Sequence, residues 1–238
     1  MTRGVFVTGT DTGVGKTLVS CALLHALRAA GHAPIPMKPI AAGAVQRGGR
    51  WINEDTEALL AAAGMDASRA DAVTPVLLRE AMAPHIAAER EGRRLTLEPV
   101  RAEYERLRRM EGFRVVEGVG GFCVPLGDAF DTVHLARYFQ LPVLLVVGLR
   151  LGCLNHALLT SQAVAAAGLP LAGWIANEID PAMAAIDENV AALAARLPAP
   201  MLGRLPFLPG ADAATAAARI DLRALLRTVG SDPTIPPA

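Results

Sequence analysis

The sequence has no net charge, few cysteines and no long apolar run, and each shortage excludes a class of protein. Its 23 basic side chains are balanced by 23 acidic ones, so no bulk attraction favours nucleic acid or an anionic membrane as a partner. The three cysteines, Cys21, Cys123 and Cys153, are scattered and form no C-x-x-C pair. A disulfide framework and a zinc site are therefore both disfavoured, and a reduced, cytoplasmic setting is expected.

The sequence also shows no segment with the pattern of a targeting signal or a membrane span. The first residues carry a single basic side chain and only a short apolar run, which is unlike a secretory signal. The longest apolar run, 141–149, contains Pro142 and is far too short to cross a bilayer. We therefore expect neither a membrane nor a nucleic acid as partner, and the ligand has to be inferred from local motifs.

What the sequence does contain is a glycine-rich turn, Gly9–Thr17, between an apolar run at 4–8 and a predicted helix at 18–30. In such a loop the backbone N–H groups converge on phosphate oxygens. Lys16 supplies a point charge for the β- and γ-phosphates, and the Thr17 hydroxyl a ligand for Mg²⁺. The turn predicts ATP or GTP binding. Its first glycine lies one residue earlier than in the usual G-x-x-x-x-G-K-[ST] pattern, so a purely structural turn is the alternative. The dinucleotide pattern G-x-G-x-x-G is absent from this turn.

Two charged residues are expected near this loop. Lys38 follows a short predicted strand, 34–37, whose prolines indicate an edge of the sheet. Asp55 lies in the first turn of a predicted helix at 53–63, after a polar loop at 46–53 that we expect to be mobile. If the strands are parallel, Lys38 can meet the γ-phosphate. A solvated lysine and an acid favoured only by the helix dipole are the alternatives.

A second informative stretch ends in a carboxylate. The predicted strand 113–116 leads to Glu117 and the glycine-rich loop Gly118–Gly121, which is where a nucleotide hydrolase or ligase places a magnesium-site acid. Burying Glu117 without a partner would cost several kcal/mol, so we expect a metal or another cation beside it. A plain salt bridge is the alternative.

Apolar runs continue to alternate with helical segments to the end of the chain. Runs at 141–147, 171–176 and 201–205 predict buried strands. This alternation predicts an α/β fold of the P-loop NTPase type, with helices on both faces of a mostly parallel sheet of about seven strands. We expect one domain over residues 1–228 and a flexible tail at 229–238.

Three polar residues in the C-terminal half of the sequence are weaker candidates for functional residues. Asn177, at the end of a predicted strand, could hydrogen-bond a purine edge or simply form a turn. Cys153 and His156 open a predicted helix that ends at Ala167. Neither has partners in a recognisable triad order, so structural roles are favoured over a nucleophile or a catalytic base.

These segments together resemble the dethiobiotin synthetase family. The resemblance rests on motifs that occur in family order from residue 4 to about residue 208. They are Gly9–Thr17, Lys38-Pro39-Ile40, Asn53-Glu54-Asp55, Pro84-His85, Glu117–Gly121, Gly152–His156 and Gly173–Asn177. That order is much more specific than any single motif, and the early position of Gly9 is itself similar to the family pattern.

The resemblance implies a reaction of 7,8-diaminopelargonic acid, CO₂ and ATP that gives dethiobiotin, ADP and phosphate, with Mg²⁺ as cofactor. One amine of the substrate takes up CO₂ as a carbamate, which attacks the γ-phosphate to form a mixed carbamic–phosphoric anhydride. The other amine then closes the ureido ring and expels phosphate. The resemblance also implies a homodimer with the substrate site at the subunit interface.

It further implies roles for individual residues. The catalytic residues would be Lys38, Lys16 and Thr12. The Mg²⁺ ligands would be Thr17, Asp55 and Glu117. The nucleotide would contact Gly13, Val14, Gly15, Lys16, Thr17, Leu18, Asp55, Glu117, Gly118, Val119, Gly120, Asn177, Glu178, Pro206, Phe207 and Leu208. The substrate would contact Thr12, Lys38, Ala42 and, from the neighbouring subunit, Gly152, Cys153, Leu154 and Asn155.

Two positions depart from the family pattern. Ala42 stands where members usually carry a hydroxyl, so one hydrogen bond to the substrate is missing or replaced by water, which affects substrate affinity more than reaction type. Many members also carry a tyrosine at a position that corresponds to the region near Asn189. The contact made by that tyrosine is therefore not expected in this protein.

Two other interpretations of the phosphate loop stay open. A cobyrinate amidation domain has the same class of loop but usually continues into a glutaminase domain, and this sequence of 238 residues is short for that. A partitioning ATPase that switches partners on membrane or DNA carries a second lysine just after the first glycine of its loop, where this chain has Asp11. Such an ATPase also uses a basic amphipathic C-terminal helix, whereas the segment 220–227 is short.

Overall fold

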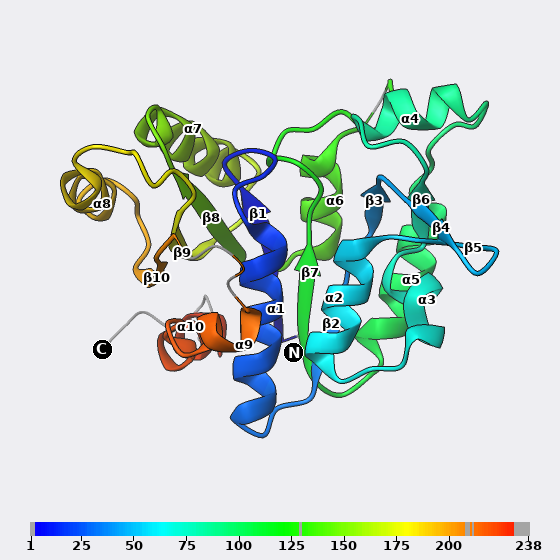
Figure 1. The fold of residues 1–238 in the computed structure, drawn as a ribbon, viewed down its shortest axis with the longest axis horizontal. Helices are drawn as coiled ribbons and strands as arrows, with labels where there is room; N and C mark the ends of the chain where they lie inside the picture. Colours follow the sequence, from blue (N-terminus) through cyan, green and yellow to red (C-terminus); the bar gives the residue numbers. More distant parts are fainter. Residues whose placement is uncertain (1–2, 129, 208–209, 211, 231–238) are drawn as a thin grey trace.

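The fold is built on a central sheet of six strands (Figure 1). The computed structural model describes residues 3–128, 130–207, 210 and 212–230. All six strands run parallel, in the order β10-β9-β8-β1-β7-β2. They are β1 (Gly4–Gly9), β2 (Pro34–Met37), β7 (Phe113–Glu117), β8 (Val143–Leu149), β9 (Leu171–Glu178) and β10 (Met201–Leu205). The predicted α/β class and parallel sheet are confirmed.

The strand order puts β1 in the middle of the sheet and sets the position of the site. The chain builds β2 and β7 on one side of β1 and then crosses over to build β8, β9 and β10 on the other side. In open parallel sheets a ligand crevice forms at the carboxyl edge where the order reverses. The segments that follow β1, β2 and β7 meet at this edge.

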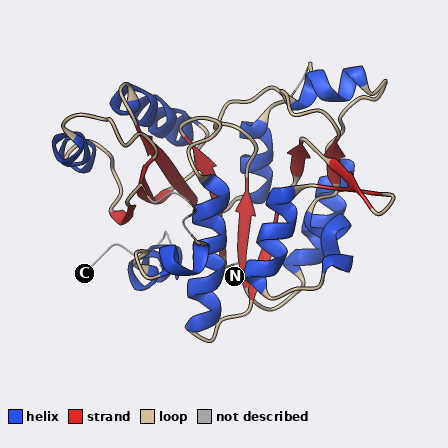
Figure 2. Ribbon diagram, viewed as in Figure 1, coloured by secondary structure: helices blue, strands red, loops and turns tan. Residues whose placement is uncertain are grey.

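Helices cover both faces of the sheet, as predicted, and Figure 2 shows them in front of and behind the strands. One face packs against α1 (Lys16–Ala29), α2 (Glu54–Ala63), α9 (Ala213–Ala217) and α10 (Leu222–Gly230). The opposite face packs against α4 (Pro84–Arg90), α5 (Glu98–Arg108), α6 (Thr132–Phe139), α7 (Cys153–Ala166) and α8 (Ile186–Ala194). Val5 and Val7 belong to the first core and Phe6 to the second. The side chains of β1 thus alternate between two buried faces.

The expected number of about seven strands was wrong for this sheet, which has six in the described residues. Two small sheets account for the remaining strands. In one, β3 (Ile40–Ala42) pairs in parallel with β6 (Val76–Leu78). In the other, β4 (Val45–Arg47) and β5 (Arg50–Ile52) form a hairpin.

The hairpin occupies most of the segment 46–53, which was expected to be a polar loop. A two-residue turn at Gly48-Gly49 returns the chain on itself and aligns β4 with β5. Arg47 then lies close to Glu54 and Glu57 of α2, with N–O distances of 3.6 and 3.2 Å. These contacts hold the hairpin beside the helix that carries Asp55.

The helices predicted at 18–30, at 53–63 and up to Ala167 are present as α1, α2 and α7. Among the other helices, α6 begins with a capping box between Asp131 and His134, and α8 follows an irregular segment. A single turn of 3-10 helix at Ala67–Arg69 runs into α3 (Ala70–Val73). The edge position predicted for the strand at 34–37 is confirmed, because β7 is the one strand that pairs with β2 in the described part of the sheet.

At the C-terminus, α10 continues to Gly230, two residues into the segment expected as a tail. Residues 231–238 lie outside the described part of the chain, so the division at residue 228 stays a prediction. In the residues that are described, the structure contains no helix that is long and apolar enough to cross a membrane.

The glycine-rich loop between β1 and α1 is fixed by a strand from the other half of the sheet. The Asn177 side chain, at the end of β9, donates from Nδ2 to the Val14 carbonyl oxygen at 2.9 Å. Gly15 has a left-handed conformation, with φ of 89°. A Cβ at this position would lie 2.1 Å from Asn177 Nδ2. Residue 15 therefore has to be glycine both for its backbone conformation and for the approach of Asn177.

This packing predicts that alanine costs more stability at position 15 than at position 13. Gly13 is also left-handed, with φ of 75°, but no described heavy atom lies within 4 Å of an added Cβ. Gly13→Ala should therefore lower the free energy of unfolding by about 1–2 kcal/mol through backbone strain alone. Gly15→Ala should lose about 1–3 kcal/mol more, because the overlap with Asn177 adds to the strain. Urea unfolding followed by circular dichroism measures both losses. Equal losses would contradict the close approach of Asn177.

Candidate functional site

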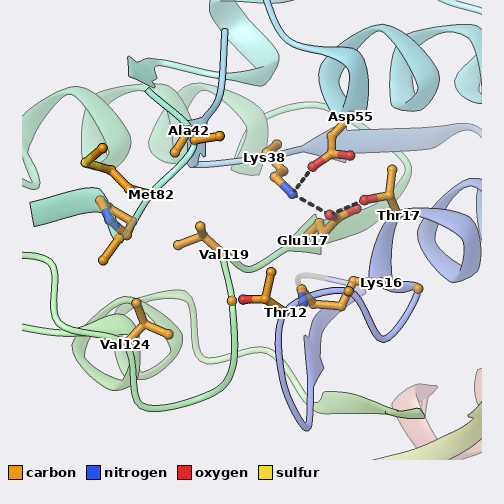
Figure 3. A pocket seen from close by; sticks show the side chains of 16 residues that line it. Thr12, Lys16, Thr17, Lys38, Ala42, Asp55, Met82, Glu117, Val119 and Val124 are labelled. Carbon is orange, nitrogen blue, oxygen red and sulfur yellow. Dashed lines mark hydrogen bonds and ion pairs between the residues drawn. The ribbon is translucent and has the colours of Figure 1, made fainter. Parts of the chain in front are cut away.

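A cavity of about 630 Å³ opens at the carboxyl edge of the sheet, beside the glycine-rich loop. Five separate segments contribute to it: the β1–α1 loop, the chain after β2, the first turn of α2, the residues before α4, and the loop after β7. Its lining residues are Thr12, Gly13, Gly15, Lys16, Thr17, Lys38, Ala42, Asp55, Ala81, Met82, Ala83, Pro84, Glu117, Val119, Gly120 and Val124. The candidate residues Thr12, Lys16, Thr17, Lys38, Asp55 and Glu117, predicted from distant parts of the sequence, are thus brought together (Figure 3).

Lys38 is the centre of a buried cluster of charges. Its Nζ lies 2.5 Å from Glu117 Oε1 and 2.7 Å from Asp55 Oδ2. The Thr17 hydroxyl donates to the same Glu117 oxygen at 2.9 Å. Glu117 is fully buried and Lys38 nearly so. The cation beside Glu117 in this structure is Lys38, so the plain salt bridge considered as the alternative for Glu117 is present. Lys38 itself is buried and paired, which excludes the solvated lysine considered for it.

The electrostatics of the cluster favour its ionised form. Burial alone would lower the pKa of Lys38, but the facing carboxylates of Glu117 and Asp55 outweigh it and raise that pKa above its usual value. Burial would likewise raise the pKa of Asp55, and the Lys38 ammonium overcomes this and lowers it. The side chain of Asp55 is 41% exposed, so this carboxylate faces the cavity while Glu117 lies beneath it.

Local structure explains why Asp55 sits at the cavity. The Asn53 side chain caps α2 by accepting a hydrogen bond from the Thr56 N–H at 3.2 Å. The Asn53 amide also donates, at 3.4 Å, to the carbonyl oxygens of Ala42 and Gly43. The cap therefore ties the start of α2 to the chain that follows Lys38, and the first turn carries Asp55 to the cavity rim.

Lys16 is the second buried cation. Its Nζ donates to the Asp11 carbonyl oxygen at 2.8 Å, inside the loop that it closes. Burial lowers the pKa of Lys16 to about 8, and Glu117 opposes this effect only in part. This ammonium is therefore far less basic than an ordinary lysine. It would gain interaction energy from any anion that enters the cavity.

One carboxylate oxygen of the cluster is left without a partner. Glu117 Oε2 is buried and accepts no hydrogen bond from the described residues. It is therefore a free oxygen donor beside the Thr17 hydroxyl and the Asp55 carboxylate. Oxygen donors of this kind suit a hard divalent cation such as Mg²⁺. The donor set is small, since no group of three or more His, Cys, Asp or Glu suited to a metal occurs in the described chain.

The cavity is polar on one side and apolar on the other, as Figure 3 shows. Thr12, Lys16 and Lys38 occupy the polar side. The apolar side is formed by Ala42, Ala81, Met82, Ala83, Val119 and Val124. Ala42, Ala81 and Ala83 carry no hydroxyl, so the hydroxyl missing at Ala42 is not replaced by these neighbours. Sequence reasoning missed the segment 81–83 and Val124, although the neighbouring Pro84-His85 pair was part of the motif set.

Several predicted nucleotide contacts lie outside this cavity. Asn177 donates a hydrogen bond to the Val14 carbonyl oxygen of the loop and does not line the cavity. Glu178 pairs with Arg204 at 2.6 Å. Leu18 and Pro206 line a small separate hollow with Asp212 and Arg219. Gly118 is buried, Phe207 is exposed, and Leu208 lies outside the described residues. Their contacts with a nucleotide stay predictions.

The segment Gly152–Asn155 also lies apart from this chain's own cavity. Gly152, with φ of 94°, precedes α7, and Cys153 is buried. The Cys153 thiol lies 3.9 Å from Asn189 Oδ1, which agrees with the structural role favoured for it. Whether this segment serves a neighbouring subunit stays a prediction.

This chain is similar to known proteins over most of its length. A family profile described as an AAA domain matches residues 3–215. Three curated relatives are named ATP-dependent dethiobiotin synthetase BioD. The relative from Aromatoleum aromaticum is 54% identical and covers 92% of this chain and 97% of its own. The relative from Nitrosospira multiformis is 50% identical and covers 93% of this chain and 96% of its own. The relative from a Janthinobacterium species is 51% identical and covers 94% of this chain and 96% of its own.

Solved structures support the fold alone. The septum site-determining protein MinD with Mg-ADP from Pyrococcus horikoshii has a TM-score of 0.51 at 19% identity, covering 96% of this chain and 95% of its own. The MinC:MinD complex from Aquifex aeolicus has a TM-score of 0.55 at 15% identity, covering 99% of this chain and 98% of its own. Both share the predicted α/β architecture over nearly the whole chain. The curated relatives match at much higher identity over a similar share of the chain. This chain belongs to the dethiobiotin synthetase family.

Proposed function

We propose that this protein is an ATP-dependent cyclo-ligase that converts 7,8-diaminopelargonic acid and CO₂ into dethiobiotin, with release of ADP and phosphate. The observation that carries the proposal is the pairing of Lys38 with Glu117 and Asp55, directly beside a phosphate loop that closes on Lys16. The membership of the family and the 54% identity to a named relative support the same reaction. A cytoplasmic setting belongs to the proposal as well.

The proposed reaction has three bond-forming steps. One amine of the substrate adds to CO₂ and loses a proton, giving a carbamate. A carbamate oxygen then attacks the γ-phosphorus of ATP, ADP leaves, and a carbamic–phosphoric anhydride forms. Finally the second amine attacks the carbamoyl carbon, the ureido ring closes, and phosphate leaves. The middle step is a phosphoryl transfer, which depends on positioning and on neutralised oxygens more than on covalent help.

The cations of the cavity would supply that neutralisation. Lys38 stays protonated because its carboxylate partners raise its pKa, so it would stabilise the carbamate and the charge that develops during its attack. Lys16 would exchange the Asp11 carbonyl oxygen for phosphate oxygens. Thr12, which lines the cavity near Lys16, would donate a hydrogen bond to the carbamate.

A magnesium ion fits the oxygen donors that face one another here. Thr17, Asp55 and Glu117 would hold it, and the unpartnered Glu117 Oε2 supports that assignment. When bound, the ion would neutralise phosphate oxygens of the nucleotide. The remaining part of ATP would follow the loop residues Gly13–Leu18 toward Asn177 and Pro206.

The methylene chain of the substrate would lie along the apolar side of the cavity, against Ala42, Met82 and Val124. We further propose a homodimer in which the segment Gly152–Asn155 receives the substrate carboxylate of the neighbouring subunit at a helix N-terminus. Leu151, beside this segment, is 95% exposed, and Leu159 on α7 is 56% exposed. Burial of these two leucines in an interface would remove apolar surface from water.

Phosphate release tests the proposed reaction. Purified protein with ATP, Mg²⁺ and bicarbonate should release phosphate only when diaminopelargonate is added, because the carbamate is the phosphoryl acceptor. Release that ignores the diamine would contradict the proposal.

Lys38→Gln should lower kcat by about 10²- to 10³-fold, as expected for loss of a charge that stabilises the transition state. Glutamine keeps a hydrogen-bond donor for the two carboxylates, and the melting temperature checks that the variant is folded. ATP binding, measured by calorimetry, should change little. The exposed Arg94, replaced by alanine, serves as a control with unchanged turnover. A Lys38→Gln variant with normal kcat would remove Lys38 from the mechanism.

The lowered pKa of Lys16 predicts pH-dependent ATP binding. In the free protein the pKa of this ammonium is about 8, and bound phosphates would raise it. Below pH 8 the affinity for ATP should change little. Above pH 8 binding has to take up a proton, so the affinity should fall by at most about tenfold per pH unit. Titration calorimetry in buffers of different ionisation enthalpy detects this uptake. Lys16→Met should bind ATP weakly and without the proton uptake. The same pH dependence in that variant would assign it to another group.

A further inference from the structure

A carboxylate lies on the phosphate loop where anions are expected to bind. Asp11 is part of the turn Gly9–Thr17, next to Thr12, and its side chain is 47% exposed. A negative charge here would repel the phosphates and the carbamate of the proposed reaction. The steps of that reaction give Asp11 no task. Its presence therefore needs a structural explanation.

Asp11 makes three hydrogen bonds, and together they fix the peptide between residues 11 and 12. Its Oδ1 accepts from the Thr12 N–H at 2.7 Å. Its Oδ2 accepts from Arg150 Nη2 at 2.5 Å. Its carbonyl oxygen accepts from Lys16 Nζ at 2.8 Å. The first two bonds fix the Asp11 carboxylate between the Thr12 N–H and Arg150. The third would be given up when Lys16 turns to phosphate oxygens, so the carboxylate bonds are the ones that can hold the peptide while nucleotide is bound.

Arg150 reaches the loop from the neighbouring strand. It directly follows β8, which pairs with β1, and the Thr10 N–H donates to the Val146 carbonyl oxygen at 3.0 Å. The Arg150 carbonyl oxygen accepts from the Cys153 N–H at 3.0 Å, at the first residue of α7. Arg150 thus joins the end of β8 and the start of α7 to the phosphate loop.

The surrounding charges also act on Asp11. The Thr12 N–H, Arg150 and His156 all lower the pKa of this carboxyl, and together they outweigh its partial burial. The carboxylate is therefore ionised when the loop is in this conformation. Arg150 is the group that both contacts it and neutralises it.

Thr12 is the residue that this arrangement positions. Its side chain lines the cavity, and its Oγ1 lies 3.5 Å from where a Cβ of Gly120 would stand. Thr12 is exposed at the cavity and lies between the Asp11 peptide and the loop after β7. A rotation of the peptide between residues 11 and 12 would move Thr12 within the cavity.

We propose that Arg150 is a positioning residue for the phosphoryl-transfer step, which holds the Thr12 peptide through Asp11 and cancels the charge of Asp11 beside the phosphates. This inference rests on the proposed function, because Thr12 matters only if a carbamate is bound near it. Arg150 is not among the residues that line the cavity. Its side chain is 40% exposed, so the ion pair contributes little to stability and its effect should appear in turnover.

The first test replaces Arg150 and separates binding from turnover. Arg150→Ala should lower kcat by about 10-fold to 10²-fold, the size expected when a catalytic group is misplaced by about 1 Å. The dissociation constant for ATP should change by less than about threefold and the melting temperature should hardly move. Arg150→Lys keeps the cation and should recover most of the loss, although its single ammonium fixes the carboxylate less well.

A matched control comes from another exposed ion pair. Arg108 lies 3.0 Å from Glu105 on α5, with side-chain exposures of 49% and 43%. Arg108→Ala removes an ion pair of similar exposure far from the cavity, so kcat should stay unchanged. An equal loss of kcat in Arg108→Ala and Arg150→Ala would overturn the proposal.

A double-mutant cycle shows whether Arg150 acts through Asp11. Asp11→Asn removes the charge but keeps an oxygen for the Thr12 N–H. In that background Arg150→Ala should lower kcat by less than about threefold, because the group it neutralises is gone. The same loss in both backgrounds would overturn the inference alone. If the unsubstituted protein releases no phosphate in response to the diamine, the proposed function fails and the inference fails with it.

Discussion

The ion pair between Lys38 and Glu117 is the contact on which the cavity depends. It joins the chain after edge strand β2 to the end of β7, and the Thr17 hydroxyl connects the same carboxylate to α1. A buried carboxylate or ammonium without a partner costs several kcal/mol. Neither group can therefore be buried without the other, and the two meet only when β1, β2 and β7 have come together. Formation of this part of the sheet and assembly of the site are thus a single process.

The sequence was sufficient to predict residues whose position follows from strand ends. Lys16, Lys38 and Glu117 each follow a predicted strand, and parallel strands end at one edge of a sheet. Their mutual contacts could not be predicted, because they depend on the order β1-β7-β2, and strand order has no local signal. The strand count differed for the same reason, because the pairing of β6 with β3 outside the main sheet is a tertiary property. On the apolar side of the cavity, residues 81–83 and Val124 were missed because alanine, methionine and valine carry no chemical motif.

The structural neighbours show how little the fold decides about the chemistry. MinD structures share the architecture at identities of 15% and 19%, and such a fold can host many functions. What distinguishes this chain lies within the phosphate loop and the residues packed on it. Asp11 stands where a partitioning ATPase carries a lysine, and here the carboxylate turns to Arg150 of the same chain. The negative charge of Asp11 is thus accompanied by a neighbouring cation, Arg150. This pair affects which groups of the loop face a ligand.

The edge strand β2 has a consequence for how two copies of this protein can meet. In a parallel pair, alternate residues direct their N–H groups to the partner strand, and the bond from the Phe113 N–H to the Ala33 carbonyl oxygen sets the alternation here. Pro34 and Pro36 then occupy the outward positions, where neither has an N–H to donate. The next outward donor, the Lys38 N–H, already bonds to the Val73 carbonyl oxygen at 2.8 Å. This edge offers a second molecule no row of free donors, so the sheet cannot be continued from one subunit into another through β2, and an assembly has to form through other surfaces.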